Sequence, residues 1–255
     1  MHNIIWKNFA MNGDKFLMEL IKSEWKQQHK KEFVSFLENQ RREEKIDWTK
    51  KIINTNMPVL AIKTPVLKQI AKEIQKGNYI DFLDLDINNY YENTIVNGSL
   101  ICSIKNFEIM KKYLDKYAMI VDNWSSCDLL KFNVKNNEEK YWNLALEYIK
   151  SDYQFKKRIG IIILFEFINN DSYIDKIYKV LDQFKNEKAY YVNMANAWLV
   201  CELFIKKRDK TLKYLDNNKL NEFTLNKAIS KCRDSFRVSE EDKTLLLGYR
   251  RNKNA

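Results

Sequence analysis

The stretch that decides the fold is residues 155–206, FKKRIGIIILFEFINNDSYIDKIYKVLDQFKNEKAYYVNMANAWLVCELFIK. Its apolar residues recur at helical spacing in three segments, which short polar runs separate. Two of these segments end in similar sequences, LFEFI from Leu164 and CELFI from Cys201, which begin 37 positions apart. This spacing is close to the length of HEAT and armadillo repeats, which are built from paired helices. The stretch therefore predicts stacked helix pairs.

The same pattern continues outside this stretch. A helix is predicted over residues 16–40, and another over 64–75, with Thr64 as its N-cap, Pro65 as its first residue and Gly77 closing it. The remaining predicted helices lie at residues 141–150, 155–168, 171–184 and 190–206. No strand-like alternation interrupts them. We therefore predict an all-α, HEAT-like helical-repeat solenoid, an α-α superhelix.

The inner helices of such a stack line a concave surface. In the last three units they are predicted at residues 122–132, 155–168 and 190–206. Lys and Arg number 44 against 34 Asp and Glu, a formal net charge of +10, so we expect a concave basic face. This charge fits a polyanionic partner such as nucleic acid, and it equally fits a well-solvated surface.

Composition bounds the domain organisation. With 255 residues, 45% of them hydrophobic, the chain can bury one sizeable core. It contains 5 glycines and 2 prolines, too few for a β-sandwich or barrel with many tight turns. We see no composition change that marks a boundary. The sequence predicts an N-terminal extension at residues 1–13 and a single helical-repeat domain over 14–255.

The sequence lacks the residue patterns of several common metal-binding, phosphate-binding and catalytic sites. The histidines are His2 and His29, and the four cysteines form no CxxC pair, so no zinc-ligand spacing exists. There is no Gly-rich phosphate loop and no GxSxG or HExxH motif, so we expect neither metal nor cofactor. The N-terminus lacks the apolar core of a signal peptide. The most apolar run is shorter than the about 20 residues that span a bilayer, so we expect a protein outside the membrane, cytoplasmic or, if the source has a nucleus, nuclear. No exposed apolar patch is obvious, so we expect a monomer.

The candidate site residues lie on the predicted inner helices. Trp124 and Asp128 are one helical turn apart and share a face. Arg158 follows Trp124 by 34 positions, and Trp198 follows Arg158 by 40, each near one repeat. These residues could therefore converge on one concave cleft. The alternative is that the tryptophans are core residues, that Asp128 caps a helix or pairs with a lysine, and that Arg158 belongs to a solvated first helical turn.

Five further residues are predicted to contact DNA or substrate: Lys157, Asn193, Lys227, Lys231 and Arg233. Lys157 belongs to the cationic start of an apolar helix, where positive charge opposes the helix dipole. Asn193 lies among small residues that could leave room for a ligand. Lys227 and Lys231 are one turn apart and share a helix face, which suits a phosphate backbone or an ordinary solvated surface.

Six motifs together resemble the AlkD-like DNA alkylation repair proteins, which are helical-repeat DNA glycosylases. In the family's order, over residues 20–250, they are VLAIKTPVLKQIAKEI (59–74), YYENTIVNGSLICSIK (90–105), VDNWSSCDLLK (121–131), FKKRIGIIIL (155–164), YYVNMANAWLVCELFIK (190–206) and NKAISKCRDSFRVSEEDK (226–243). The resemblance implies excision of cationic N3- and N7-alkylated purines from double-stranded DNA without base flipping. It implies catalytic roles for Trp124 and Asp128, with Arg158 and Trp198 completing the site.

The residue types agree with this chemistry. An alkylated purine of this kind is already cationic, so its glycosidic bond is weak and needs no protonation by histidine. Asp128 would stabilise the oxocarbenium-like sugar and orient water. The rings of Trp124 and Trp198 would hold the cationic nucleotide, at about 1–2 kcal/mol each. Arg158 would bind a neighbouring phosphate.

Two departures from the family pattern keep other hypotheses open. Asn123 precedes Trp124, where some members carry a second aromatic residue. Residues 50–53 read KKII where some active members carry an aromatic residue, and Trp48 is the nearby candidate substitute. A second hypothesis is therefore a non-catalytic HEAT-repeat protein that binds branched or distorted DNA. A third is a protein–protein scaffold.

Overall fold

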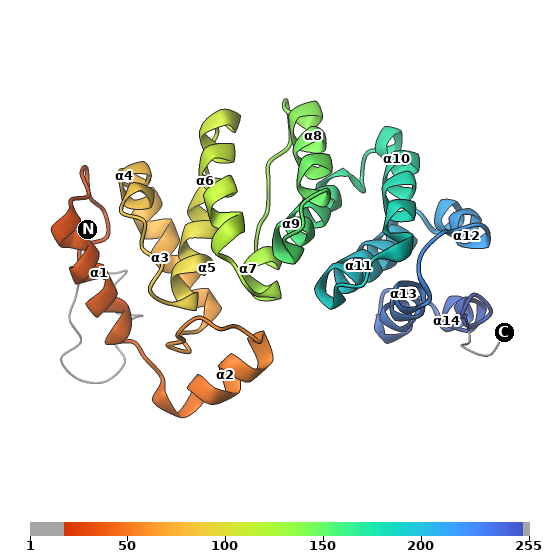
Figure 1. Ribbon diagram of the computed structural model, residues 1–255, viewed down its shortest axis with the longest axis horizontal. Coiled ribbons are helices and arrows are strands. Elements are labelled where there is room, and N and C mark those ends of the chain that lie inside the picture. The colour runs from red at the N-terminus through yellow and green to blue at the C-terminus, as the bar shows by residue number, and fades with distance from the viewer. Residues whose placement is uncertain (1–17, 252–255) are drawn as a thin grey trace. The chain divides into compact units, whose positions relative to one another are not determined.

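A computed structural model describes residues 18–251 of the chain (Figure 1). Over that range the fold consists of fourteen α-helices and three short 3-10 helices, with no β-strand. The predicted all-α fold of repeated helices is confirmed. The predicted extension at residues 1–13 lies outside the described residues.

The chain divides between Leu129 and Leu130 into two compact units. The helices of the N-terminal unit are α1 (Gln27–Glu38), α2 (Ile46–Ile53), α3 (Thr64–Gln75), α4 (Tyr79–Asp84), α5 (Tyr91–Ile101), α6 (Phe107–Ile120) and α7 (Trp124–Asp128). Those of the C-terminal unit are α8 (Glu138–Ile149), α9 (Gln154–Leu164), α10 (Asp171–Leu181), α11 (Tyr190–Lys206), α12 (Arg208–Asp216), α13 (Glu222–Asp234) and α14 (Glu240–Leu247). The single domain over residues 14–255 and its concave basic face stay predictions.

The first predicted helix, over residues 16–40, is wrong at its N-terminal side. Helix α1 begins at Gln27, and residues 18–26 are not helical. Met18 and Leu20 are buried and alternate with exposed residues, as in an extended segment that packs one side on the protein. A short apolar run fits a helix and an extended segment equally well, so spacing alone did not distinguish them.

Helix α3 has the predicted bounds. Its N-cap is Lys63, not the predicted Thr64, so Pro65 is the second helical residue, where its missing N–H also has no helical partner to lose. Gly77 follows the helix as expected. A Cβ atom at Gly77 would lie 2.3 Å from the backbone oxygen of Lys22. Glycine there lets the extended first segment pack against the end of α3.

Helix α5 packs against α3, α4 and α6 and carries a fully buried carboxylate. Glu92 accepts the backbone N–H of Leu60 at 3.1 and 3.0 Å and that of Ile62 at 3.3 Å. Ala61 between them has a left-handed φ of 59°. Burial raises the pKa of Glu92 above its ordinary value, although these backbone hydrogen bonds act to lower the pKa. The carboxylate thus fixes the irregular chain that leads into α3.

The predicted inner helix at residues 122–132 is wrong in length, because α7 ends at Asp128. From Leu130 the chain is non-helical, and the side chains of Leu130 and Phe132 are buried. The backbone N–H of Phe132 donates to the Glu166 carboxylate at 3.2 Å. A side chain 34 positions away therefore replaces the helical hydrogen-bond acceptor.

In the C-terminal unit α8 packs on α9, α9 on α11, and α11 on α13. Helix α11 has the predicted bounds, and the helices predicted at 155–168 and 171–184 each end in a 3-10 turn. Gly160 permits the contact of α9 with α8. A Cβ atom there would lie 2.9 Å from both the Ala145 oxygen and the Ile149 nitrogen.

Candidate functional site

Helix α7 carries the two central candidates and is held by the residue before it. The fully buried Asn123 caps the helix, because its side-chain oxygen accepts the N–H of Ser126 at 2.9 Å. Its amide nitrogen donates to Asp122 at 3.2 Å. Asp122 in turn accepts the Thr55 hydroxyl at 2.5 Å and the Asn56 N–H at 2.7 Å. The start of α7 is therefore tied to the segment that follows α2.

The serines of α7 attach it to α5 and α6. The Ser125 hydroxyl lies 2.7 Å from the hydroxyl of Tyr91, and the Ser126 hydroxyl lies 2.6 Å from that of Thr94. The hydroxyl of Tyr117 donates to the carbonyl of Ser126 at 2.8 Å. Burial raises the pKa of Tyr91 to about 12, so its phenol is neutral at pH 7. Five residues of helix are thus fixed by three hydroxyl contacts as well as the cap.

Trp124 and Asp128 occupy the part of α7 that is not fully buried. They lie one turn apart, as predicted, and each is half-buried. The indole N–H of Trp124 donates to the carbonyl of Ile52 at 3.3 Å. This hydrogen bond orients the ring against the end of α2. The structure therefore brings a fixed tryptophan and a carboxylate together on one short helix.

Helix α2 adds two apolar side chains that are accessible to solvent. Trp48 is 63% exposed and Ile52 is 46% exposed, and they lie one helical turn apart. Ile52 is also the residue whose carbonyl receives the Trp124 indole. Trp48, the candidate substitute for an absent aromatic residue, is thus open to solvent on a helix that contacts Trp124.

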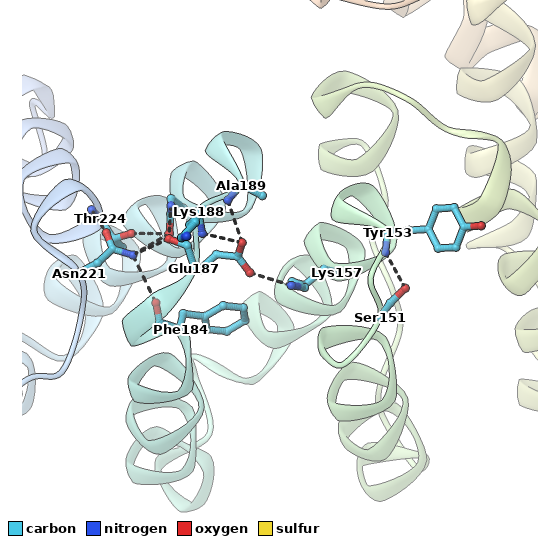
Figure 2. A network of polar contacts seen from close by, with 10 residues as sticks. Ser151, Tyr153, Lys157, Phe184, Glu187, Lys188, Ala189, Asn221 and Thr224 are labelled. Atoms are coloured by element: carbon cyan, nitrogen blue, oxygen red, sulfur yellow. Dashed lines mark hydrogen bonds and ion pairs between the residues drawn. The ribbon is translucent and has the colours of Figure 1, made fainter.

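In the C-terminal unit Glu187 connects α9 with α11 (Figure 2). The Lys157 ammonium lies 2.7 Å from one carboxylate oxygen, and the N–H groups of Ala189 and Lys188 donate to the other at 2.8 and 2.9 Å. Burial pushes the pKa of Glu187 upward, but these hydrogen bonds lower it below its ordinary value overall. The ion pair also offsets the unfavourable position of Lys157 in the first turn of α9.

Asn193 lies on the other side of the same network and is 4% exposed. Its amide nitrogen donates to the carbonyl of Glu187 at 3.1 Å. Its amide oxygen accepts from Asn221 at 3.0 Å and from the Thr224 hydroxyl at 2.8 Å. Both the nitrogen and the oxygen of the amide therefore form hydrogen bonds within the protein, and these bonds join α11 to α13. Contact of Asn193 with substrate stays a prediction.

Arg158 is also enclosed, with 5% of its surface exposed. Its guanidinium donates to the carbonyl of Tyr191 in the first turn of α11. The neighbouring Lys156 ammonium lies 4.7 Å from the ring centroid of Tyr148. The positive charges that begin α9 thus have local partners. The predicted contact of Arg158 with a phosphate stays a prediction.

Trp198 is half-buried on α11 and packs on Phe165, with ring centroids 4.5 Å apart. Its indole N–H donates to the carboxylate of Glu202 at 3.4 Å. Arg237 forms an ion pair with the same carboxylate, one of its nitrogens lying 2.9 Å from Oε2. Trp198 is therefore oriented by a carboxylate one turn along its own helix.

The three predicted cations of the C-terminal segment all lie on α13. Lys227 and Arg233 are exposed, and Lys231 is half-buried. Lys231 and Arg233 belong to the last turn, where positive charge favours the helix dipole. The predicted common face of Lys227 and Lys231 follows from the helix. Their contact with DNA stays a prediction.

Over residues 18–251, no group of three or more His, Cys, Asp and Glu side chains is placed to hold a metal ion. No helix there has the length and apolar character needed to cross a bilayer.

A comparison with protein families adds the decisive observation. Residues 34–232 match the family described as DNA alkylation repair enzyme, and this range includes α7, α9 and α11. The chain belongs to the DNA alkylation repair enzyme family. Membership confirms the resemblance seen in the motifs and makes DNA the material on which this family acts. No curated protein matches the chain.

Two contributors to the geometry of this family member carry no local signal in the sequence. Glu187 lies in KNEK, a polar connection where a charged residue is ordinary, and its partner Lys157 is 30 positions away. Asp122 likewise meets Thr55 across 67 positions. The exposed rings of Tyr190 and Phe223 were also not anticipated. Both rings belong to the first turn of a helix.

Proposed function

We propose that the chain is a DNA glycosylase that excises cationic N3- and N7-alkylated purines from duplex DNA without base flipping. The observation that carries the proposal is the construction of α7. Asn123, Ser126 and Cys127 are buried and hydrogen bonded, while Trp124 and Asp128 remain partly accessible, as does Ser125 between them. Membership of the alkylation repair family supports the same reading. A pre-oriented ring and carboxylate suit a substrate that is cationic before and during the reaction.

In the proposed reaction the C1′–N bond breaks and its electron pair goes to the cationic purine, which leaves as a neutral base. The positive charge passes to the sugar, where C1′ and the ring oxygen share it. The Asp128 carboxylate stabilises this charge and orients a water molecule. Water adds to C1′ and releases a proton, which leaves an abasic site. No group needs to protonate the leaving base, so we propose no metal and no cofactor.

The face of Trp124 would contact the cationic nucleotide, and a cation over a tryptophan ring contributes about 0.5–2 kcal/mol. The hydrogen bond to Ile52 sets the ring's orientation before DNA binds. We assign Arg158 to a phosphate and Trp198 to the nucleotide, as the family resemblance implies. The remaining proposed DNA contacts are Lys157, Asn193, Lys227, Lys231 and Arg233. The positive charges of the three lysines and Arg233 would make binding sensitive to salt.

We further propose that the HEAT-like chain acts as a cytoplasmic monomer. Its four cysteines form no disulfide and three of them are buried, in keeping with their expected role as small apolar side chains. This arrangement suits a reducing compartment.

Base release from methylated duplex DNA tests the proposal. The duplex is treated with a methylating agent and incubated with the protein, and free bases are quantified by chromatography with mass spectrometry. We expect 7-methylguanine or 3-methyladenine above the protein-free level. A non-catalytic DNA-binding protein would show salt-dependent binding without release, and a protein scaffold would show neither. Either of these results would refute the glycosylase.

A further inference from the structure

The C-terminal unit contains a pocket of about 640 Å³ that takes no part in the proposed bond breaking at α7, although Asn193 and Lys227 in its lining are among the proposed DNA contacts. It lies between the first turn of α11, the face of α13 and the chain that follows α14. Its volume is within the range of small-molecule sites, about 300–1,000 Å³. The residues that give it its chemical character are Lys188, Tyr190, Phe223, Lys227, Ser230 and Arg250.

Two aromatic rings line this pocket and remain open to solvent. Tyr190 is 54% exposed and Phe223 is 40% exposed. Their ring centroids are 5.8 Å apart and their planes are tilted by 59°. Exposed rings in a concave site usually mark a binding surface rather than the core. Every nucleobase has a π-face that can stack on such rings.

Positive charge accompanies the rings. The Lys227 ammonium lies 5.7 Å from the ring centroid of Phe223. Lys188 and Arg250 are exposed at the same pocket. Two carboxylates also line the pocket: Glu187, which is already paired with Lys157, and Glu222, which is outnumbered by the three cations. The pocket therefore offers cations beside aromatic faces, the pairing that a phosphate and its base require.

The pocket walls are held in place without a ligand. Arg250 donates to the Ser230 hydroxyl at 3.2 Å. The next residue, Arg251, donates to the carbonyl of Asn218 at 3.0 Å, which anchors the chain that carries Arg250. On the opposite side Asn221 donates to the carbonyls of Phe184 and Glu187, each at 3.3 Å (Figure 2).

The polar side chains of the pocket are engaged with the protein. Asn226 donates to the carbonyl of Arg251 at 2.7 Å and accepts its N–H at 3.0 Å. Ser230 donates to the carbonyl of Asn226 and accepts from Arg250. Few groups are left to read the edge of a base, so recognition by stacking and charge would depend little on sequence.

We infer that this pocket binds an unpaired nucleotide of a DNA strand, with its base on Tyr190 and Phe223 and its phosphate at Lys227 and Arg250. The inference rests on the proposed action on DNA, and it gives the protein a contact with single-stranded or distorted segments. Base stacking contributes about 1–3 kcal/mol, which corresponds to roughly 5- to 150-fold in affinity. The alkylated base itself is assigned to α7 and not to this pocket.

Fluorescence anisotropy with a labelled single-stranded oligodeoxynucleotide of mixed sequence tests the inference. The double variant Tyr190→Leu, Phe223→Leu keeps apolar bulk and removes both rings. We expect single-strand affinity to fall by roughly 5- to 150-fold. The matched control is Phe236→Leu, which removes a 94% exposed ring of the same unit outside this pocket, and we expect it to bind as the wild type does. Circular dichroism melting verifies that all variants are folded.

Three results would overturn the inference: no single-strand binding by the wild type, equal binding by the double variant, or an equal loss in Phe236→Leu. Binding of the corresponding RNA but not of DNA would overturn the choice of partner. Release of methylated bases by the wild type is measured separately. Its absence would refute the glycosylase and leave the single-strand result standing, so the two proposals can fail independently.

Discussion

Replacement of Asn123 by alanine tests how the structure holds α7. The change removes the oxygen that accepts the Ser126 N–H at 2.9 Å and the amide that donates to Asp122 at 3.2 Å. Asn123 is fully buried, so water cannot readily replace these bonds. The variant keeps Trp124 and Asp128 and alters only what positions them.

The expected loss of stability follows from these contacts. Loss of an asparagine N-cap costs about 0.5–2 kcal/mol. A buried donor left without a partner adds about 1–3 kcal/mol. We therefore expect Asn123→Ala to lower the free energy of unfolding by about 1.5–5 kcal/mol. Each 1.4 kcal/mol lowers the ratio of ordered to disordered α7 about tenfold. Trp124 and Asp128 lose their fixed orientation in the disordered fraction, so base release should fall.

Urea unfolding followed by circular dichroism measures the stability, and single-turnover release of methylated bases measures the activity. Asn106→Ala is the matched control, because Asn106 caps α6 in the same unit through the N–H of Ile109 at 3.1 Å but is exposed. It should lose about 1 kcal/mol and keep its activity. Asn123→Ser, which retains a capping hydroxyl, should recover part of both losses.

If Asn123→Ala is no less stable than Asn106→Ala, the buried cap does not hold α7. If its stability falls while base release is unchanged, α7 is not the scaffold of the active site. Either result would refute the reasoning.

Three further predictions concern packing, pH and salt. Gly160→Ala should lose about 1–2 kcal/mol in urea unfolding because α8 and α9 must move apart, whereas Gly248→Ala, with 3.4 Å to the nearest atom, should be neutral. The folded-state pKa of Glu187 is lowered, so its pair with Lys157 stabilises the fold above the unfolded value of about 4.3 and this contribution disappears as pH falls through the folded pKa. Unfolding curves at several pH values should show that Glu187→Gln loses less free energy of unfolding at acid pH than the wild type does. An identical loss would contradict the stabilising role of the Glu187–Lys157 pair. Lys231→Ala should weaken binding to duplexes of every sequence and reduce the slope of log affinity against log salt concentration by about 1. An unchanged slope would show that Lys231 does not contact the DNA backbone.

The sequence predicts helices best where apolar spacing and end signals agree. Helices α3 and α11 have their predicted bounds because proline, glycine and a long apolar run mark them locally. The predictions of helix for residues 18–26 and for the chain after Asp128 were wrong because contacts with residues far away in the sequence determine the backbone conformation there. Gly77 receives the first segment, and Glu166 accepts the N–H of Phe132.

The site shows the same division. Helical spacing places Trp124 and Asp128 one turn apart, and this much required only the sequence. Their support comes from Thr55, Thr94 and Tyr117, which no local pattern links to α7. Contacts across 67, 32 and 9 positions have no periodic signature, so only the folded chain reveals them.

The central claim is that the Asp128 carboxylate stabilises a developing sugar cation. Single-turnover release of 7-methylguanine from methylated duplex DNA by Asp128→Asn tests it most directly, because the substitution keeps the shape and removes the charge. The control is Asp115→Asn, a half-exposed carboxylate of α6 in the same unit. We predict that Asp128→Asn loses on the order of 10²-fold in rate with unchanged duplex affinity, while Asp115→Asn matches the wild type. Equal rates for Asp128→Asn and the wild type would contradict the account.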